Sequence, residues 1–165
     1  KLKFNPNMHR VISVDVVHMY PNVNVPSTIS YILDKIYENP IKYFPFKNKH
    51  GIPLTPPTRE NFKNFLINTF QNFSIFKSPI GIFKQKSGLS MGSSISASIA
   101  TSFVNIMEQI VVKKYVNENK VIFYQRYADD VIIIIRKNSI RTFFKDINSF
   151  DGKLKFTLQE MDLKN

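Results

Sequence analysis

The chain has 165 residues, no cysteine and a formal net charge of +11. This length allows one domain with a buried core, and the lack of cysteine excludes disulfides and thiolate zinc sites. The positive surplus favours nucleic acid over a membrane as partner, because the sequence offers no long basic amphipathic helix for a membrane surface.

The first half of the chain predicts one strand followed by two helices. Residues 11–17 are β-branched and predict a buried strand that carries a single acid, Asp15. A helix capped by Ser27 is expected to run to about residue 37, and a second helix starts at Thr58 with phenylalanines along one face. Between these helices, the proline-rich residues 40–57 predict a connector or surface excursion.

The second half begins with a predicted hairpin over residues 75–83. The small-residue segment QKSGLSMGSS then predicts a loop that opens into a helix over about residues 95–116. Small residues at a helix entrance let the backbone approach a ligand, and the free amides there favour anions. Further elements are predicted in this order: strands at 121–124 and 131–135, a helix capped by Ser139, and a strand at 154–158.

The tetrapeptide Tyr127-Ala128-Asp129-Asp130 lies between the two central predicted strands. A chain reversal there would put two adjacent carboxylates at the tip of a hairpin. Such acids are costly to bury beside apolar strands, so they need water or a metal ion. Taken alone, the pair is explained equally well as a solvated turn.

The order of elements predicts an α+β fold, a small antiparallel sheet with helices packed on one face. If the Asp15 strand lies beside the hairpin, Asp15, Asp129 and Asp130 converge at one sheet edge. Three carboxylates without cationic partners suit Mg²⁺, and two such ions form a clamp for phosphoryl transfer. A basic body around this acidic site predicts a metal-dependent enzyme that acts on nucleic acid.

Three motifs in this order resemble the palm of a reverse transcriptase over about residues 11–161. VDVVHMY at 14–20 is similar to the family's first acidic motif, residues 85–96 to its glycine motif, and YADD at 127–130 to its double acid. The segments FKQKSGLSMGSSIS and LKFTLQEM look most like those of Penelope-like retroelements, which are relatives of telomerase. The resemblance implies RNA-directed DNA synthesis with two Mg²⁺ ions (or Mn²⁺), an RNA template, a DNA primer and deoxynucleoside triphosphates.

The resemblance also assigns roles around the reacting centre. It implies that Asp15, Asp129 and Asp130 are the catalytic metal ligands, assisted by the main-chain carbonyl of Val16. It implies that Tyr20 lies under the sugar and excludes a ribose 2′-hydroxyl, with a core tyrosine as the alternative explanation.

The same resemblance assigns contacts to the substrates. Lys153 is the candidate general acid that protonates pyrophosphate, with a solvated turn lysine as the alternative. Five more positions are implied: Gln85, Gly88 and Gly92 beside the nucleotide and template, and Arg126 and Tyr127 at the primer end.

The chain departs from the family pattern in several ways. Ser94 stands where these elements usually carry proline, which we expect to affect the helix start more than the chemistry. Only fourteen residues precede Asp15, so residues 1–165 are expected to form a single palm-core domain that lacks most of the fingers and all of the thumb. No endonuclease segment is evident. We therefore expect a palm that is weak or inert alone, located in the nucleus if it comes from a eukaryotic retroelement.

Two alternatives stay open at this stage. The first is an RNA-dependent RNA polymerase palm. Tyr20 distinguishes it from a reverse transcriptase, because an RNA polymerase must admit the 2′-hydroxyl and so avoids a bulky aromatic residue there. The second is a catalytically idle palm that serves as a nucleic-acid-binding module.

Overall fold

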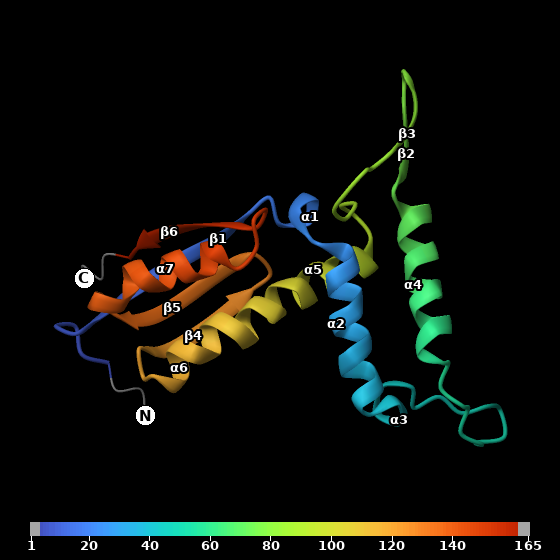
Figure 1. The fold of residues 1–165 in the computed structure, drawn as a ribbon, viewed down its shortest axis with the longest axis horizontal. Helices are drawn as coiled ribbons and strands as arrows, with labels where there is room; N and C mark the ends of the chain where they lie inside the picture. The colour runs from blue at the N-terminus through green and yellow to red at the C-terminus, as the bar shows by residue number, and fades with distance from the viewer. Residues whose placement is uncertain (1–3, 162–165) are drawn as a thin grey trace.

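The computed structural model describes residues 4–161, apart from the side chains of residues 71–73 and 94. The molecule is elongated (Figure 1). A sheet with its covering helices forms one end, and a second group of helices with a projecting hairpin forms the other. Helix α5 runs from beneath the sheet to α2, so it links the two ends.

The sheet has four antiparallel strands in the order β4-β5-β1-β6. Their bounds are His9–Val17 for β1, Val121–Tyr127 for β4, Asp130–Arg136 for β5 and Lys155–Glu160 for β6. The predicted strands are confirmed, although β1 begins two residues earlier than expected because His9 is buried and pairs with Arg136. The strand with the first acid therefore lies directly beside the hairpin with the other two.

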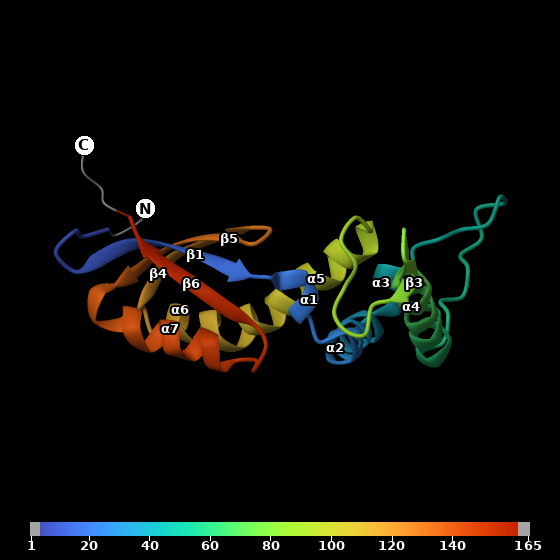
Figure 2. The ribbon, with the colours of Figure 1, turned by 90° about the horizontal axis from the view of Figure 1, so that it is seen from above.

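Helices cover one face of this sheet, as predicted (Figure 2). Helix α5 (Ser94–Met107), the π-helix η1 (Glu108–Val112) and α6 (Lys113–Asn117) form one continuous rod. Beside it lies α7 (Ile140–Ser149), which follows the 3₁₀ turn η2 (Lys137–Ser139). Alternate residues of the strands point into the resulting core, which includes Ile12, Val14, Phe103, Ile133 and Phe143.

The π-helix interrupts a stretch that the sequence predicts as uniform helix over residues 95–116. By length and apolar composition, the helix over Ile95–Asn117 is able to cross a membrane. The core helix of a globular protein passes the same test, and here Ala100, Phe103 and Val104 are buried in the core beneath the sheet.

The other end of the molecule is built on α2 (Val25–Glu38), which packs against both α5 and α4 (Arg59–Phe73). Ile29, Leu33 and Leu66 form a small separate core there. The remaining elements are the short helices α1 (Met19–Asn22) and α3 (Pro40–Tyr43), and the hairpin of β2 (Ile75–Ser78) and β3 (Gly81–Lys84).

The helix caps differ in part from the prediction. The Asn24 side chain accepts a hydrogen bond from the Ser27 amide, so Asn24 caps α2 and the prediction of Ser27 is wrong. The reason is that Val25 and Pro26 already occupy the first helical positions, where proline is well tolerated. The Thr58 cap is confirmed, since its hydroxyl accepts from the Asn61 amide. Ser139 precedes α7 but forms no side-chain cap bond.

Candidate active site

The carboxylates of the first and third motifs come together through strand register. Asp15 on β1 is the pairing partner of Asp130 on β5, so both side chains leave the same face of the sheet. The main-chain amide of Val16 donates to the carbonyl of Asp129 at 3.3 Å, which joins the hairpin tip to β1. All three acids are exposed, and within residues 4–161 none of them forms an ion pair.

Strand pairing supports a site for a divalent ion, whereas the side chains do not form a complete cluster of ligands. Opposed, exposed carboxylates that no cation neutralises are the oxygen ligands that Mg²⁺ prefers. In the part of the chain that the structure describes, however, no three acidic or histidine side chains stand together as a metal-binding group. The paired positions of Asp15 and Asp130 fit an ion held between their carboxylates, and Asp129 is the adjacent residue of the same turn.

The turn that carries Asp129 has an unusual backbone. Two residues, Ala128 and Asp129, connect the paired residues Tyr127 and Asp130. Ala128 has φ 55°, in the left-handed region that costs an L-residue about 1–2 kcal/mol. The guanidinium of Arg126 donates from Nη1 to the Ala128 carbonyl at 3.0 Å, so this strained residue is held by a neighbouring side chain.

Arg126 is held in turn by Glu108, the first residue of η1. Its Nε donates to Glu108 Oε1 at 2.6 Å and its Nη2 to Oε2 at 3.4 Å. The two side chains are only 11% and 17% exposed. The Tyr124 hydroxyl donates to the same Oε1 at 2.7 Å.

This burial changes the proton affinities of the cluster. Burial, followed by the hydrogen bond to Glu108, raises the pKa of Tyr124. Burial by itself lowers the pKa of Arg126, but the hydrogen bond and charge of Glu108 outweigh it and raise that pKa. Tyr124 is therefore held as a neutral phenol and Arg126 as a cation. Tyr127, also predicted at the primer end, is by contrast 84% exposed.

The glycine motif docks against the segment that follows Asp15. The Leu89 amide donates to the Tyr20 carbonyl at 2.9 Å. Gly88 has φ +75°, and a Cβ on it would lie 2.4 Å from the carbonyl oxygen of Pro21. Only glycine allows this approach, which holds the loop against the segment that follows β1. The Tyr20 side chain is half-buried against the core.

Gln85 organises the glycine loop from within. Its side-chain amide donates to the carbonyls of Ser87 at 2.7 Å and Leu89 at 3.2 Å. Its main-chain amide donates to the Ser74 carbonyl at 2.7 Å, which ties the loop to the end of α4. Gly92, the second predicted glycine, is exposed with φ +94°, and a Cβ on it would have no heavy atom within 4 Å.

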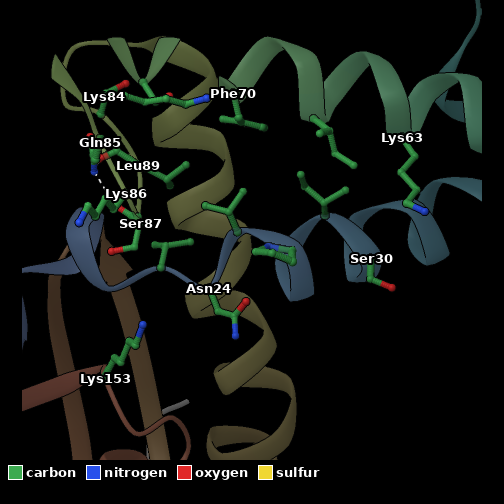
Figure 3. A pocket seen from close by; sticks show the side chains of 18 of the residues that line it. Asn24, Ser30, Lys63, Phe70, Lys84, Gln85, Lys86, Ser87, Leu89 and Lys153 are labelled. Atoms are coloured by element: carbon green, nitrogen blue, oxygen red, sulfur yellow. Dashed lines mark hydrogen bonds between the residues drawn. The ribbon is translucent and has the colours of Figure 1, made fainter. Parts of the chain in front are cut away.

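A cavity of about 740 Å³ lies between α2, α4 and this loop (Figure 3). Gln85, Gly88 and Lys153 all line it, so the structure brings the candidate general acid into one space with two predicted nucleotide residues. The three site acids and Tyr20 are not part of the lining. The described lining contains no acid but five cations: Arg59, Lys63, Lys84, Lys86 and Lys153.

A family model described as reverse transcriptase (RNA-dependent DNA polymerase) matches residues 9–161. The chain belongs to this family. Comparison with curated proteins finds no match.

Two solved telomerase structures resemble this reverse transcriptase domain. Telomerase from Candida albicans, in complex with a TWJ fragment of telomeric RNA, gives a TM-score of 0.63 at 12% identity over 95% of this chain. Apo telomerase from Candida tropicalis, truncated from its C-terminal domain, gives 0.65 at 16% identity over 96%. The chain spans 28% and 32% of those two chains, so the likeness concerns the fold of this part alone.

Sequence reasoning missed two features of this reverse transcriptase domain. Glu108 is the single acid between residues 61 and 117, and an isolated acid in an apolar helix was the available signal. The basic cavity is the second feature. Its signal in the sequence was the charge imbalance of residues 39–107, which hold eight lysines and arginines but one acid, Glu60. Both features depend on which distant elements pack together, which local periodicity does not reveal.

Proposed function

We propose that this chain is the catalytic palm of an RNA-directed DNA polymerase, which extends a DNA primer on an RNA template with deoxynucleoside triphosphates. The observation that carries the proposal is the register of β1 and β5. It sets Asp15 opposite Asp130 at the point where the Asp129 carbonyl meets the Val16 amide. Membership of the reverse transcriptase family supports the reaction class.

In this proposal Asp15, Asp129 and Asp130 hold two divalent ions, Mg²⁺ or Mn²⁺, with the Val16 carbonyl as a further oxygen ligand. Bound metal stabilises the charge that develops in phosphoryl transfer. The protein contributes three exposed carboxylates, free of competing cations within residues 4–161, on a hairpin fixed to the central strand. Tyr127, exposed beside the turn, and Arg126 are proposed at the primer end.

The basic cavity suits the anionic parts of the substrates. Phosphate groups bind where cations and free main-chain amides converge, and this lining offers cations from α4, the glycine loop and the turn before β6. We assign Gln85, Gly88 and Gly92 to the border of nucleotide and template, and Lys153 to proton donation to pyrophosphate. Tyr20 is proposed to exclude the ribose 2′-hydroxyl.

We further propose a retroelement origin of the Penelope-like type, with a nuclear location if the host is a eukaryote. The support is the sequence of residues 83–96 and 154–161, which resembles those elements. The telomerase-like fold is compatible with this relationship.

Replacement of Asp129 by Asn tests the function. In the complete polypeptide that carries this palm, we expect D129N to lower nucleotide addition to a DNA primer on RNA by roughly a hundredfold or more. Its circular dichroism spectrum and Tm should stay unchanged, because the exposed Asp129 side chain supports no described contact.

Glu118→Gln is the matched control, since this exposed acid precedes the opposite end of β4. It should retain full activity. Full activity of D129N would overturn the metal assignment. A wild-type protein that binds primer and template but adds no nucleotide would support the idle palm instead.

A further inference from the structure

We infer that Glu108 is a positioning residue that sets the geometry of the Ala128–Asp129 turn by way of Arg126. This inference rests on the proposed function, because the turn carries one of the proposed catalytic acids. Glu108 touches no candidate substrate-binding residue other than Arg126 in the described contacts. Its effect must therefore pass through the guanidinium.

The chain of contacts is continuous from helix to turn. One edge of the Arg126 guanidinium donates to Glu108 through Nε at 2.6 Å and Nη2 at 3.4 Å. The remaining nitrogen, Nη1, donates to the Ala128 carbonyl at 3.0 Å. Because the guanidinium is rigid and planar, binding of Nε and Nη2 to Glu108 also fixes the direction of Nη1. A lysine ammonium would not be oriented in this way. Glu108 thereby determines where the Ala128 carbonyl is held.

The turn needs such support. Ala128 adopts φ 55°, which an L-residue populates only when its surroundings impose it. The peptide that follows this carbonyl belongs to Asp129, so a shift of the carbonyl moves the carboxylate as well. The Asp129 carbonyl is held separately by the Val16 amide at 3.3 Å. The two bonds together clamp the turn from both sides of the hairpin.

The helix geometry at Glu108 fits this role. Glu108 is the first residue of η1, the π-helical segment between α5 and α6. The widened π turn changes the direction in which helix residues point, and such turns are frequent at functional sites. Glu108 is also the single acid from residue 61 to residue 117, so neighbouring residues of the helix provide no substitute.

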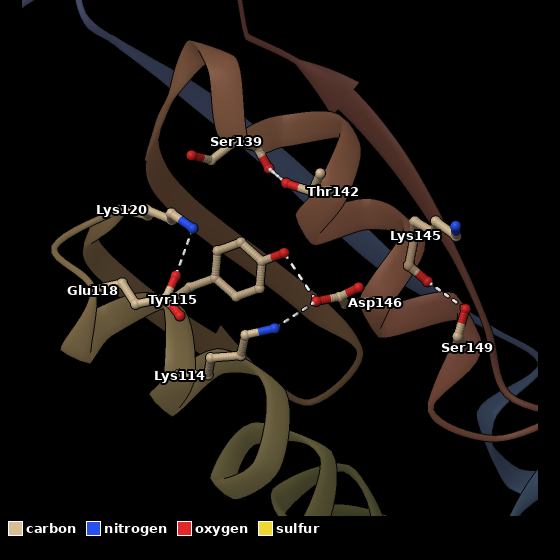
Figure 4. Close-up of polar contacts among 9 residues, drawn as sticks. All are labelled: Lys114, Tyr115, Glu118, Lys120, Ser139, Thr142, Lys145, Asp146 and Ser149. Atoms are coloured by element: carbon tan, nitrogen blue, oxygen red, sulfur yellow. Dashed lines mark hydrogen bonds and ion pairs between the residues drawn. The ribbon is translucent and has the colours of Figure 1, made fainter.

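A pair that only stabilises the fold would show the same contacts, and the chain contains a natural control for that case (Figure 4). On α6 and α7, the Tyr115 hydroxyl donates to Asp146 at 3.0 Å and Lys114 pairs with the same carboxylate at 3.3 Å. This is again a tyrosine, a cation and a carboxylate that join two elements. None of its described contacts reaches the turn.

The test compares Glu108→Gln and Arg126→Lys with Asp146→Asn in the complete polypeptide. We expect E108Q and R126K each to lower kcat for primer extension at least tenfold, with KM for the nucleotide changed less than threefold. The double variant should be no worse than either single one, because both remove the same support. D146N should lower Tm by less, because the Lys114–Asp146 pair is more exposed, and it should leave kcat unchanged.

A second readout does not depend on activity. In NMR spectra of the 165-residue chain, E108Q and R126K should shift the amide signals of Ala128 and Asp129 and speed their hydrogen exchange, whereas D146N should not. Unchanged turn signals, or a kcat that falls equally in D146N, would overturn the positioning role. An inactive wild type with these turn effects present would instead remove the proposed function and leave the positioning role standing.

Discussion

The strands that carry the acids alternate buried apolar residues with exposed polar ones. Asp15 and Asp130 are exposed on strands whose neighbours Val14 and Val131 are buried, because side chains alternate across a strand. The motif residues thus reach solvent while their neighbours support the core. Tyr20 is intermediate, since its ring packs partly on the core next to the glycine motif.

Tyr20 is the residue on which sugar selection is predicted to depend. We expect Tyr20→Ala to raise ribonucleotide incorporation about tenfold or more, equal to ~1.4 kcal/mol of discrimination. The reason is that the aromatic ring no longer occupies the space of a 2′-hydroxyl. Incorporation ratios measured with competing ribo- and deoxynucleotides test this, with Tyr20→Phe as the bulk-preserving control. An unchanged ratio in the alanine variant would assign Tyr20 to the core alone.

Tyr124 predicts a specific alkaline dependence of stability. Burial and the bond to Glu108 raise its pKa above the ordinary value of about 10, so folding favours the protonated phenol. Below pH ~10 both folded and unfolded states hold the proton and this stabilisation is complete. Above it, the unfolded state loses its proton first, and the free energy of unfolding should fall by about 1.4 kcal/mol per pH unit from this group. Urea unfolding between pH 9 and 11 should show a shallower fall for Tyr124→Phe, and identical slopes would contradict the coupling.

At the scale of elements, the site is made by two junctions. The first is the β1–β5 ladder, which sets the register of the acids. The second is the contact of the glycine loop with the residues after β1, through Leu89 and Tyr20. Ser94, the departure from the usual proline, is the first residue of α5, which agrees with an effect on the helix start. Proline is favoured at that position because its amide would have no helical partner.

The two glycines of the loop provide a matched pair for a stability prediction. Gly92→Ala meets open space and should cost only the left-handed backbone strain, about 1–2 kcal/mol. Gly88→Ala carries the same strain and also drives a Cβ to 2.4 Å from the Pro21 carbonyl oxygen, so it should cost more and displace the loop. Denaturant unfolding of both variants measures the difference. Equal costs would mean that the loop does not rest on Pro21.

Positive charge is concentrated at one end of the molecule. Residues 39–93 hold eight of the lysines and arginines and only one acid, and they form the α4 end of the molecule with the hairpin. The three proposed metal ligands lie at the sheet end. A polyanion is thus attracted to one part of the surface while the acids stay available to cations in another.

This charge separation predicts salt-sensitive binding of nucleic acid. The affinity of the 165-residue chain for a primer–template duplex should fall steeply between 50 and 200 mM salt, because bound phosphates release counterions. Lys84→Gln and Lys86→Gln should each lower the slope of log K against log salt by about 1. Lys35→Gln is the control, since Lys35 pairs with Glu38 on α2. Binding that ignores salt would exclude the basic cavity as the contact surface.

The sequence by itself determined the α+β class, most of the strands and helices, the basic charge and three segments that resemble motifs of the reverse transcriptase family. These features depend on residue type and on spacing within a few positions, which periodicity reports directly. Only the tertiary structure decided that Asp15 faces Asp130, that Gly88 rests on Pro21, that Lys153 shares a cavity with Gln85 and that Glu108 holds Arg126. Each of these contacts joins residues far apart in the chain, and it follows from strand register and helix packing rather than from local pattern.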